Sequence, residues 1–391
     1  MSASFLPNHD SCDGSETLPI ALQASLNQDV LLTEASLTLK GYPKGQGRRR
    51  KAALLMVLVW GTLFLLHLSS VGFWIIGGLT ICIGAHTLRL LGIHPPIALS
   101  PLDPDAAAET YPFVSLVVAA KDEEAVIASL VEKLCALEYP ASRYELWVID
   151  DHSSDRTPLL LADLTQQYPH MNWLRRSAGA TGGKSGALNQ VLPLLKGDII
   201  GVFDADAQVS TDLLLGVVPY FDNPQIGAVQ VRKAIANANE NFWTKGQQIE
   251  MILDAFMQDQ RSTAGGIGEL RGNGQFVRRA ALERCGNWNE DTITDDLDLT
   301  FRLHLDHWNI ASVIFPVVQE EGVTRMIGLW HQRNRWAEGG YQRYLDYWPL
   351  LLSNRLGPRK TLDLTVFWTL QYLLPTAAIP DTLFSLWRNH L

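Results

Sequence analysis

Two aspartates separated by one alanine, in "FDADAQ" (residues 203–208), follow an apolar run and could hold a metal ion. The run 198–206 predicts a β-strand, and alternate residues of a strand point the same way, so Asp204 and Asp206 can face one point. Converging carboxylates repel each other unless a cation neutralises them. Mg²⁺ commonly takes one or two carboxylates together with phosphate oxygens. The pattern indicates Mg²⁺, or alternatively Mn²⁺, holding a nucleotide diphosphate; the alternative is a solvated turn.

Two further acid pairs follow apolar segments of the chain. Asp150 and Asp151 end the predicted strand 144–151, and Asp295 and Asp296 open a segment with helical spacing. Acids in the first turn of a helix interact favourably with its dipole. Helix capping is therefore a structural alternative to a chemical role at both places.

The elements that must position these acids are strands alternating with helices. The predicted strands are 113–120, 144–151, 171–176 and 198–206. The predicted helices between them are 123–140, 153–169 and 182–195. Such alternation predicts an α/β fold with a mostly parallel sheet and helices on both faces. Ligands of these sheets bind outside the carboxyl ends of the strands, where the first two acid pairs fall.

Long uncharged segments near the N-terminus predict a transmembrane hairpin over residues 48–93. Residues 52–70 contain no formal charge, and residues 71–93 contain none before Arg89. Nineteen residues rise roughly 28 Å as a helix, enough for a bilayer core. A signal peptide is the alternative, but its apolar core would be shorter and nearer the N-terminus. The basic run at 48–51 predicts that this end, and the domain after the hairpin, face the cytoplasm.

Composition separates the remaining segments. Residues 1–47 are polar and without periodicity, which predicts a disordered tail, and the Pro-rich residues 94–112 predict a linker. Residues 326–360 are aromatic and basic, which is typical of interfacial helices, and 361–391 predicts another transmembrane segment interrupted by Pro375 and Pro380. The net charge of −9 argues against nucleic acid as a partner.

Seven motifs in order give the chain a family resemblance. They are "VSLVVAAKDEE", "VIDDHSSD", "GGKSGALN", "FDADA", "GNGQFVRR", "ITDDLDLTFRL" and "HQRNRWAEGG". Together they resemble a family-2 inverting glycosyltransferase of the membrane-bound branch that contains cellulose and hyaluronan synthases. The resemblance implies a cytoplasmic GT-A (Rossmann-like) domain over residues 113–325.

The resemblance also implies a donor site for a UDP-sugar. Asp151 corresponds to the residue that contacts uracil, and Lys184 to a lysine beside the nucleotide. Asp206 corresponds to the direct metal ligand, and Asp204 to the acid that lies nearer the sugar and shares the metal site. The family often has glycine where this chain has His152, so the loop geometry there is open.

The catalytic and acceptor residues implied by the resemblance lie further along the chain. Asp296 corresponds to the general base, with Asp295 in place of a more usual glutamate. Gln332 and Arg335 correspond to residues that hold the donor diphosphate, and Trp336 to a wall of the acceptor site. The alternative for these last three is a purely interfacial helix.

Within this branch, the short chain with its N-terminal hairpin resembles the glycolipid-forming members most. They imply transfer of glucose from UDP-glucose to the hydroxyl of 1,2-diacylglycerol, giving a β-glycolipid in a plasma or thylakoid membrane. A processive polysaccharide synthase is one alternative, although three predicted spans are few for a polymer tunnel. An inactive membrane scaffold with a nucleotide-binding fold is the other.

Overall fold

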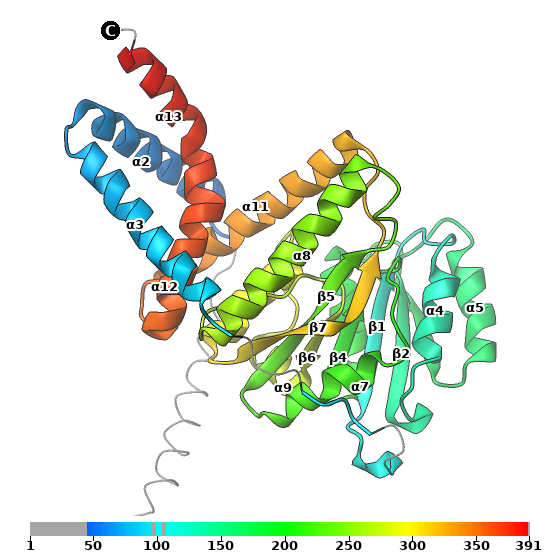
Figure 1. The fold of residues 1–391 in the computed structure, drawn as a ribbon. Helices are drawn as coiled ribbons and strands as arrows, with labels where there is room; N and C mark the ends of the chain where they lie inside the picture. Colours follow the sequence, from blue (N-terminus) through cyan, green and yellow to red (C-terminus); the bar gives the residue numbers. More distant parts are fainter. Residues whose placement is uncertain (1–44, 95–98, 104–106, 390–391) are drawn as a thin grey trace, which may run out of the picture.

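The computed structural model describes residues 45–94, 99–103 and 107–389. Nearly all of the predicted tail (1–47) and part of the predicted linker (94–112) lie outside the described residues. The described chain forms an α/β domain with a group of long helices beside it (Figure 1).

A seven-stranded sheet in the order β3-β2-β1-β4-β6-β5-β7 forms the centre of the domain. The strands are β1 (Val114–Ala120), β2 (Tyr144–Asp150), β3 (Met171–Arg175), β4 (Ile199–Phe203), β5 (Ile226–Ile235), β6 (Gln275–Arg278) and β7 (Asn309–Glu320). All neighbouring strands are parallel except β6, which runs antiparallel to both β4 and β5. The prediction of a mostly parallel α/β sheet is confirmed.

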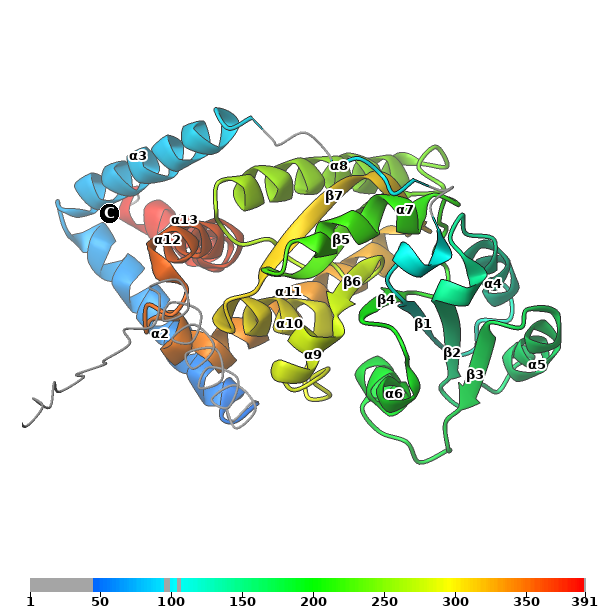
Figure 2. The same cartoon turned by 90° about the horizontal axis from the view of Figure 1, so that it is seen from below.

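Helices cover both faces of the sheet because the central strands are apolar on both sides. Leu116 and Val118 of β1 pack with α4 (Ile127–Cys135), α5 (Thr157–Gln167) and α7 (Leu213–Val217). Val117, between them in sequence, packs on the other face. That face is covered by α6 (Gly183–Val191), α9 (Arg279–Arg284) and α10 (Asp295–Leu305). Figure 2 shows the sheet edge-on between these layers.

The second half of the sheet was not predicted. β6 has four residues, and β5 pairs with β7 through two register irregularities, so neither leaves a clean alternation in the sequence. The long helix α8 (Phe242–Thr263) was also missed, although its start carries a local signal. Asn241 accepts hydrogen bonds from the N–H groups of Trp243 and Thr244, which is a capping box.

The predicted hairpin corresponds to α2 (Arg48–Leu68) and α3 (Gly72–Leu91). In the described part of the chain these two helices are long and apolar enough to cross a membrane. They lie with the C-terminal helices on the side of the molecule away from α4 and α5 (Figure 1). The bilayer topology and the domain boundaries stay predictions.

The C-terminal segment is helical without a break. α12 (Gly357–Trp368) continues through a π turn (Thr369–Leu373) into α13 (Leu374–Asn389). The predicted interruption is therefore wrong, because Pro375 and Pro380 both lie inside α13. The π turn directly before Pro375 is the irregularity with which the helix accommodates a ring that has no N–H.

Helix α2 is attached to the C-terminal half of the chain. His67 Nε2 lies 2.9 Å from Asp381 Oδ1, and Arg388 donates to the His67 carbonyl at 2.8 Å. At the other end, Lys51 donates to the Leu345 carbonyl of α11 (Met326–Leu351) at 3.0 Å. Part of the basic run at 48–51 thus binds the protein itself.

A buried cluster of charges joins the sheet domain to these helices. Glu269 is fully buried and lies 3.0 Å from Arg343 of α11 and 3.0 Å from Arg271. Arg261 of α8 lies at 4.0 Å from the same carboxylate and pairs with Asp363 of α12 at 2.9 Å. Burial opposes the charge of Glu269, but the three arginines lower the pKa of Glu269 to about 2.

We expect Glu269→Gln to lower the free energy of unfolding by about 3–5 kcal/mol, because it leaves buried guanidinium groups uncompensated. Thermal unfolding in detergent would measure this. Glu283→Gln is the matched control: its carboxylate is half exposed beside Arg279, and its loss should change stability by less than about 0.5 kcal/mol. Equal effects of the two variants would contradict the importance of the cluster.

Candidate active site

The first two acid pairs meet at one edge of the sheet. β2 and β4 lie on either side of β1, with Asp150 opposite Ala120 and Phe203 opposite Val118. All three strands are parallel, so the residues that follow them leave the sheet at the same edge. This brings Asp151 and Asp204 to the same region as the loop after β1.

Lys184 neutralises the first aspartate of the Asp-Ala-Asp motif. Its Nζ lies 2.5 Å from Asp204 Oδ1, and it stands in the first turn of α6. Gly182, with φ 83°, makes the tight entry to that turn. Burial opposes both charges, but each group stabilises the charged form of the other. As a result the pKa of Lys184 is raised and the pKa of Asp204 is lowered.

Asp151 is held by an arginine that the sequence analysis did not single out. Arg176 Nη1 donates to Asp151 Oδ1 at 2.5 Å and to the Gly183 carbonyl at 3.1 Å. Arg176 therefore ties Asp151 to the turn that carries Lys184. Asp151 does not cap α5, since that helix has no side-chain cap at Arg156.

The rest of the "VIDDHSSD" turn is structural. Asp150 is fully buried, and its Oδ1 accepts a hydrogen bond from Ser153 N–H at 3.0 Å, which supports the turn. His152 has φ 58°, the left-handed conformation that glycine adopts without strain. The backbone here thus keeps a glycine-like geometry although the residue is histidine.

Asp206 carries an unbalanced charge. Burial and the neighbouring Asp204 raise its pKa, and it accepts one long hydrogen bond, at 3.4 Å, from Glu321 N–H. Glu123, in the loop after β1, has a pKa raised by burial and then by Asp206 and Asp204. Within the described residues no three acidic, histidine or cysteine side chains form a metal-binding group. Asp206 and Asp204 are the two neighbouring carboxylates that could bind a Mg²⁺ or Mn²⁺ ion together with substrate phosphates.

The carboxyl group of Asp296 has a pKa well above that of an ordinary aspartate. It lies in the first turn of α10, where its Oδ1 accepts from Leu297 N–H at 2.8 Å. Burial, followed by the charge of Asp295, raises the pKa of Asp296 to about 6. Thr294 precedes the helix but makes no side-chain cap, whereas Asp295 and Asp296 both lie in the first turn, where their charges interact favourably with the helix dipole.

A cavity of about 380 Å³ joins the lysine turn to the start of α10. Its lining residues come from these two places: Gly182, Gly183, Lys184, Ser185, Glu290, Thr292, Ile293 and Asp295. Glu290 accepts a hydrogen bond from the Asn189 side chain at 2.8 Å. The cavity is therefore bordered by one ammonium group and two carboxyl groups, which suits a polar, hydroxyl-rich ligand.

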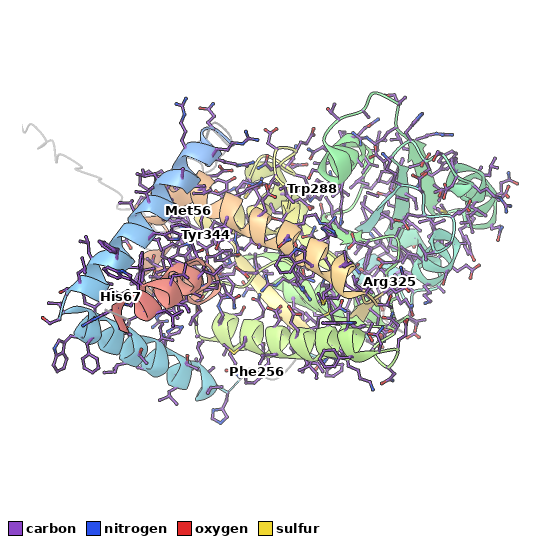
Figure 3. The ribbon with its side chains drawn as sticks, turned by 90° about the horizontal axis from the view of Figure 1, so that it is seen from above. Met56, His67, Phe256, Trp288, Arg325 and Tyr344 are labelled. Carbon is purple, nitrogen blue, oxygen red and sulfur yellow. The ribbon has the colours of Figure 1, made fainter. Side chains whose placement is uncertain are left out.

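Helix α11 brings the last predicted residues to the same edge of the sheet. Arg335 is close enough to Asp204 to help lower its pKa, after Lys184 and Lys233. Trp336 packs between Arg333 and Lys233, whose charged groups lie 4.2 Å and 5.5 Å from its ring centre. Gln332 stands one helical turn before Trp336. Figure 3 shows α11 running from Arg325 toward Tyr344, where it approaches α2.

The family model described as "Glycosyltransferase like family 2" matches residues 112–339, which include every element of this site. The chain belongs to glycosyltransferase family 2. The family predicted from the seven motifs is therefore confirmed.

Relatives of this glycosyltransferase extend the similarity beyond the matched domain, to α2, α3 and the C-terminal helices. The chain is 58% identical, over 393 residues, to a beta-monoglucosyldiacylglycerol synthase of a Nostoc species, covering all of this chain and 82% of that protein. It is 57% identical over 344 residues to the synthase of the same name from a Synechocystis species, covering 88% of this chain and 72% of that one.

A solved structure supports the fold. The mannosyltransferase PcManGT from Pyrobaculum calidifontis, in complex with GDP-Man and Mn²⁺, superposes with a TM-score of 0.54. It is 19% identical, covering 84% of this chain and 99% of that one. At that identity the likeness shows the GT-A-like fold of this glycosyltransferase alone.

Four residues at the site were missed by sequence reasoning: Arg176, Glu123, Glu290 and Lys233. Arg176 and Glu123 follow predicted strands at their carboxyl ends, so their position was a usable signal. Lys233 lies near the end of the unpredicted strand β5 and pairs with Glu320 of β7 at 2.9 Å. Glu290 lies in a loop without a local pattern.

The position of Asp295 and Asp296 depends on one close helix contact. Gly339 of α11 packs directly on Thr294, so a Cβ atom at residue 339 would collide with the Thr294 side chain. We expect Gly339→Ala to displace the start of α10, to slow glycosyl transfer and to lower stability by about 1–3 kcal/mol. Transfer assays and thermal unfolding would measure these effects.

Gly246→Ala in α8 is the matched control, because a Cβ atom there meets nothing within 4 Å. That variant should keep its activity and gain up to about 1 kcal/mol of stability. Unchanged activity and stability in Gly339→Ala would show that α11 does not constrain the acids.

Proposed function

We propose that this chain transfers glucose from UDP-glucose to the free hydroxyl of 1,2-diacylglycerol, with inversion, to give β-monoglucosyldiacylglycerol. The observation that carries the proposal is the 57–58% identity to synthases of that name. In two of them the match covers the whole of this chain, including α2 and α3.

The side chains of Asp151, Lys184 and Asp206 form the donor side of the proposed site. Asp151 keeps one carboxylate oxygen outside its contact with Arg176, and that oxygen can accept the uracil N–H. Asp206 and Asp204 would hold a Mg²⁺ or Mn²⁺ ion, which neutralises diphosphate charge when bound. Lys184 balances Asp204, so the charge left for a cation to neutralise is that of Asp206.

Asp296 acts as the general base in the proposed mechanism. It takes the proton from the diacylglycerol hydroxyl while that oxygen bonds to C1 of glucose. The bond from C1 to the UDP oxygen breaks on the opposite side, which inverts the anomeric centre. A pKa near 6 keeps this carboxyl ionised at neutral pH yet more basic than an ordinary aspartate. Arg335 of α11 stabilises the departing diphosphate, with Gln332 on the same helix, and Trp336 borders the acceptor.

The proposed acceptor is dissolved in a lipid bilayer, and the helices beside the domain suit that environment. α2 and α3 are candidate membrane spans. α8 adds an exposed apolar stripe with Ile249, Leu253 and Phe256 at helical spacing. Phe256 points away from the sheet in Figure 3. We propose membrane attachment with the catalytic domain on the cytoplasmic side.

The full chain in liposomes containing diacylglycerol tests this function. With a panel of UDP-glucose, UDP-galactose and UDP-N-acetylglucosamine, we expect glucose alone to be transferred, once per lipid, with products identified by mass. A chelator should abolish transfer, and Mg²⁺ or Mn²⁺ should restore it. A product that lengthens with time would indicate a polysaccharide synthase, and no turnover with any donor would indicate a scaffold. Full activity in excess chelator would overturn the metal site.

We expect Asp296→Asn to lower transfer by a factor of about 10² to 10⁴, the usual contribution of a general base. Calorimetric UDP binding in the presence of Mg²⁺ should change little, because the base does not hold the donor. Loss of UDP binding in parallel with activity would make Asp296 a donor-site residue instead.

Asp295→Asn is the matched comparison for this variant. It keeps the base and removes the neighbouring charge that raises the pKa of Asp296. Since the base works only when deprotonated, the acidic limb of the pH–rate profile should lie near pH 6 in the wild type. The limb should move to lower pH in Asp295→Asn. If the acidic limb stays at the same pH in Asp295→Asn, it does not report the ionisation of Asp296.

A further inference from the structure

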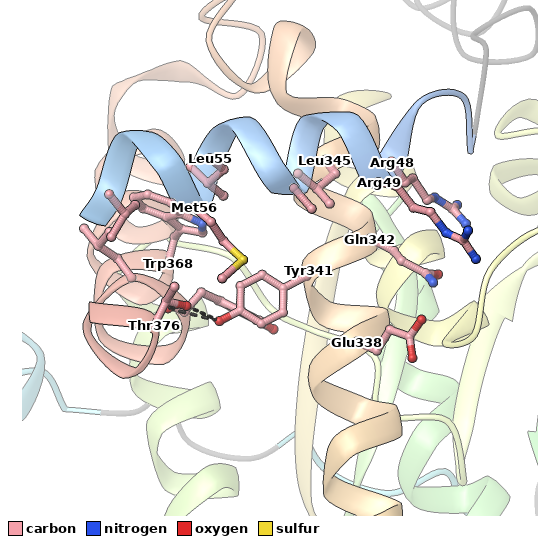
Figure 4. Close-up of a pocket in the computed structure, with 14 residues that line it drawn as sticks. Arg48, Arg49, Leu55, Met56, Glu338, Tyr341, Gln342, Leu345, Trp368 and Thr376 are labelled. Carbon is pink, nitrogen blue, oxygen red and sulfur yellow. Dashed lines mark hydrogen bonds between the residues drawn. The ribbon is translucent and has the colours of Figure 1, made fainter. Parts of the chain in front are cut away.

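A second, apolar cavity of about 500 Å³ lies between α2, α11 and the C-terminal helix (Figure 4). Ala52, Leu55, Met56 and Val59 of α2 form one wall. Arg48 and Arg49, at the start of the same helix, also line the cavity. The remaining lining comes from α11 (Glu338, Tyr341, Gln342 and Leu345) and from the C-terminal helix (Trp368, Tyr372, Leu373 and Thr376).

The polar groups in the wall of this cavity are bonded to each other. Tyr341 Oη lies 2.6 Å from Thr376 Oγ1 and donates to the Tyr372 carbonyl at 3.1 Å. Gly340, which has no side chain, lets the Tyr372 ring lie directly against α11. The wall therefore presents hydrocarbon and aromatic surface, which suits an apolar ligand.

The two ends of the cavity differ in polarity. Arg48, Arg49, Glu338 and Gln342 lie at one end, and Met56, Trp368 and Thr376 lie at the other (Figure 4). Arg48 is bound to the Asp346 carboxylate at 3.0 Å. The polar end thus holds two arginines and two carboxylates, so its formal charges balance. Such an end suits an uncharged polar group better than a phosphate.

The polar end lies next to the catalytic acids. The Gln342 side-chain oxygen accepts a hydrogen bond from Ile293 N–H at 3.3 Å. Ile293 lines the polar cavity of about 380 Å³ beside Lys184, which we call the donor cavity. One helical turn earlier, Gly339 packs on Thr294, directly before Asp295 and Asp296. The loop that ends in the catalytic acids therefore separates the polar donor cavity from the apolar one.

We infer that this apolar cavity binds the glycerol backbone and the adjoining acyl chains of the diacylglycerol acceptor. The inference rests on the proposed function and locates its acceptor. The neutral glycerol hydroxyl lies at the charge-balanced end and reaches toward Asp296. The acyl chains lie against Leu55 and Met56 and continue into the bilayer along α2. A candidate membrane helix as one wall lets the lipid enter without passing through water.

A bulky residue in the cavity tests this assignment. Ala52→Trp fills the cavity from α2, and we expect the KM for diacylglycerol in liposomes to rise by about tenfold or more while the KM for UDP-glucose stays within about twofold. Leu58→Trp is the matched control on the same helix, since Leu58 is exposed and does not line the cavity. It should leave both constants unchanged. Unchanged constants in Ala52→Trp would overturn the site and leave the proposed function standing.

A binding measurement without turnover separates the two proposals. Diacylglycerol with a photoreactive group in one acyl chain, in liposomes without UDP-glucose, should label peptides of α2 and α11 in the wild type. Ala52→Trp should reduce that labelling, and unlabelled diacylglycerol should compete for it. Labelling of a wild type that forms no glucosyl lipid would support the cavity and overturn the proposed function. Equal competition by phosphatidylglycerol would show unselective contact with bilayer lipid and overturn the cavity.

Folding of the variants is checked by UDP affinity and unfolding temperature. If Ala52→Trp loses either, Met56→Phe replaces it, because Met56 lines the apolar end of the cavity and is 43% exposed, which leaves room for an aromatic ring. That variant must raise the KM for diacylglycerol without changing the KM for UDP-glucose. A change in neither constant, or in both equally, overturns the site.

Discussion

One buried carboxylate, Glu269, sets the position of helix α11 against the sheet. Three arginines from α8, α11 and the loop after Glu269 surround it, and none of the four charges can be removed alone without leaving an uncompensated charge in the interior. Because Asp363 extends the cluster to α12, the same interaction also orients the C-terminal helix. The positions of α11 beside the sheet and of the C-terminal helix therefore depend on one electrostatic junction.

The acids of the active site have different properties because their neighbours differ. Asp204 has Lys184 at hydrogen-bond distance, which favours its charged form. Asp206 and Asp296 are partly buried beside other acids, which disfavours theirs. An acid with an unbalanced charge attracts a cation, and an acid with a raised pKa can accept a proton. Environment alone thus gives chemically identical carboxyl groups different affinities for protons.

A transferase that joins a water-soluble donor to a membrane lipid must bring two incompatible environments within a bond length. A polar cavity borders the start of α10, and an apolar cavity lies beyond the contact between Ile293 and Gln342. Gly339 allows the close approach of α11 that makes the arrangement possible. Helix α2, a candidate membrane span, is held to α11 and to the loop before α10 by Arg48, which binds Asp346 and the Asp291 carbonyl.

The sequence alone determined the parallel half of the sheet, the acids at its edge and the apolar hairpin, because strand alternation, helical spacing and uncharged length are local patterns. It did not reveal β5 to β7, whose pairing joins strands that are distant in the chain and irregular in register. It also missed Arg176 as the partner of Asp151, and Arg48 as the partner of Asp346, 298 residues away. Such contacts are selected only when the chain packs, since burial makes an unpaired charge costly whatever its distance in sequence.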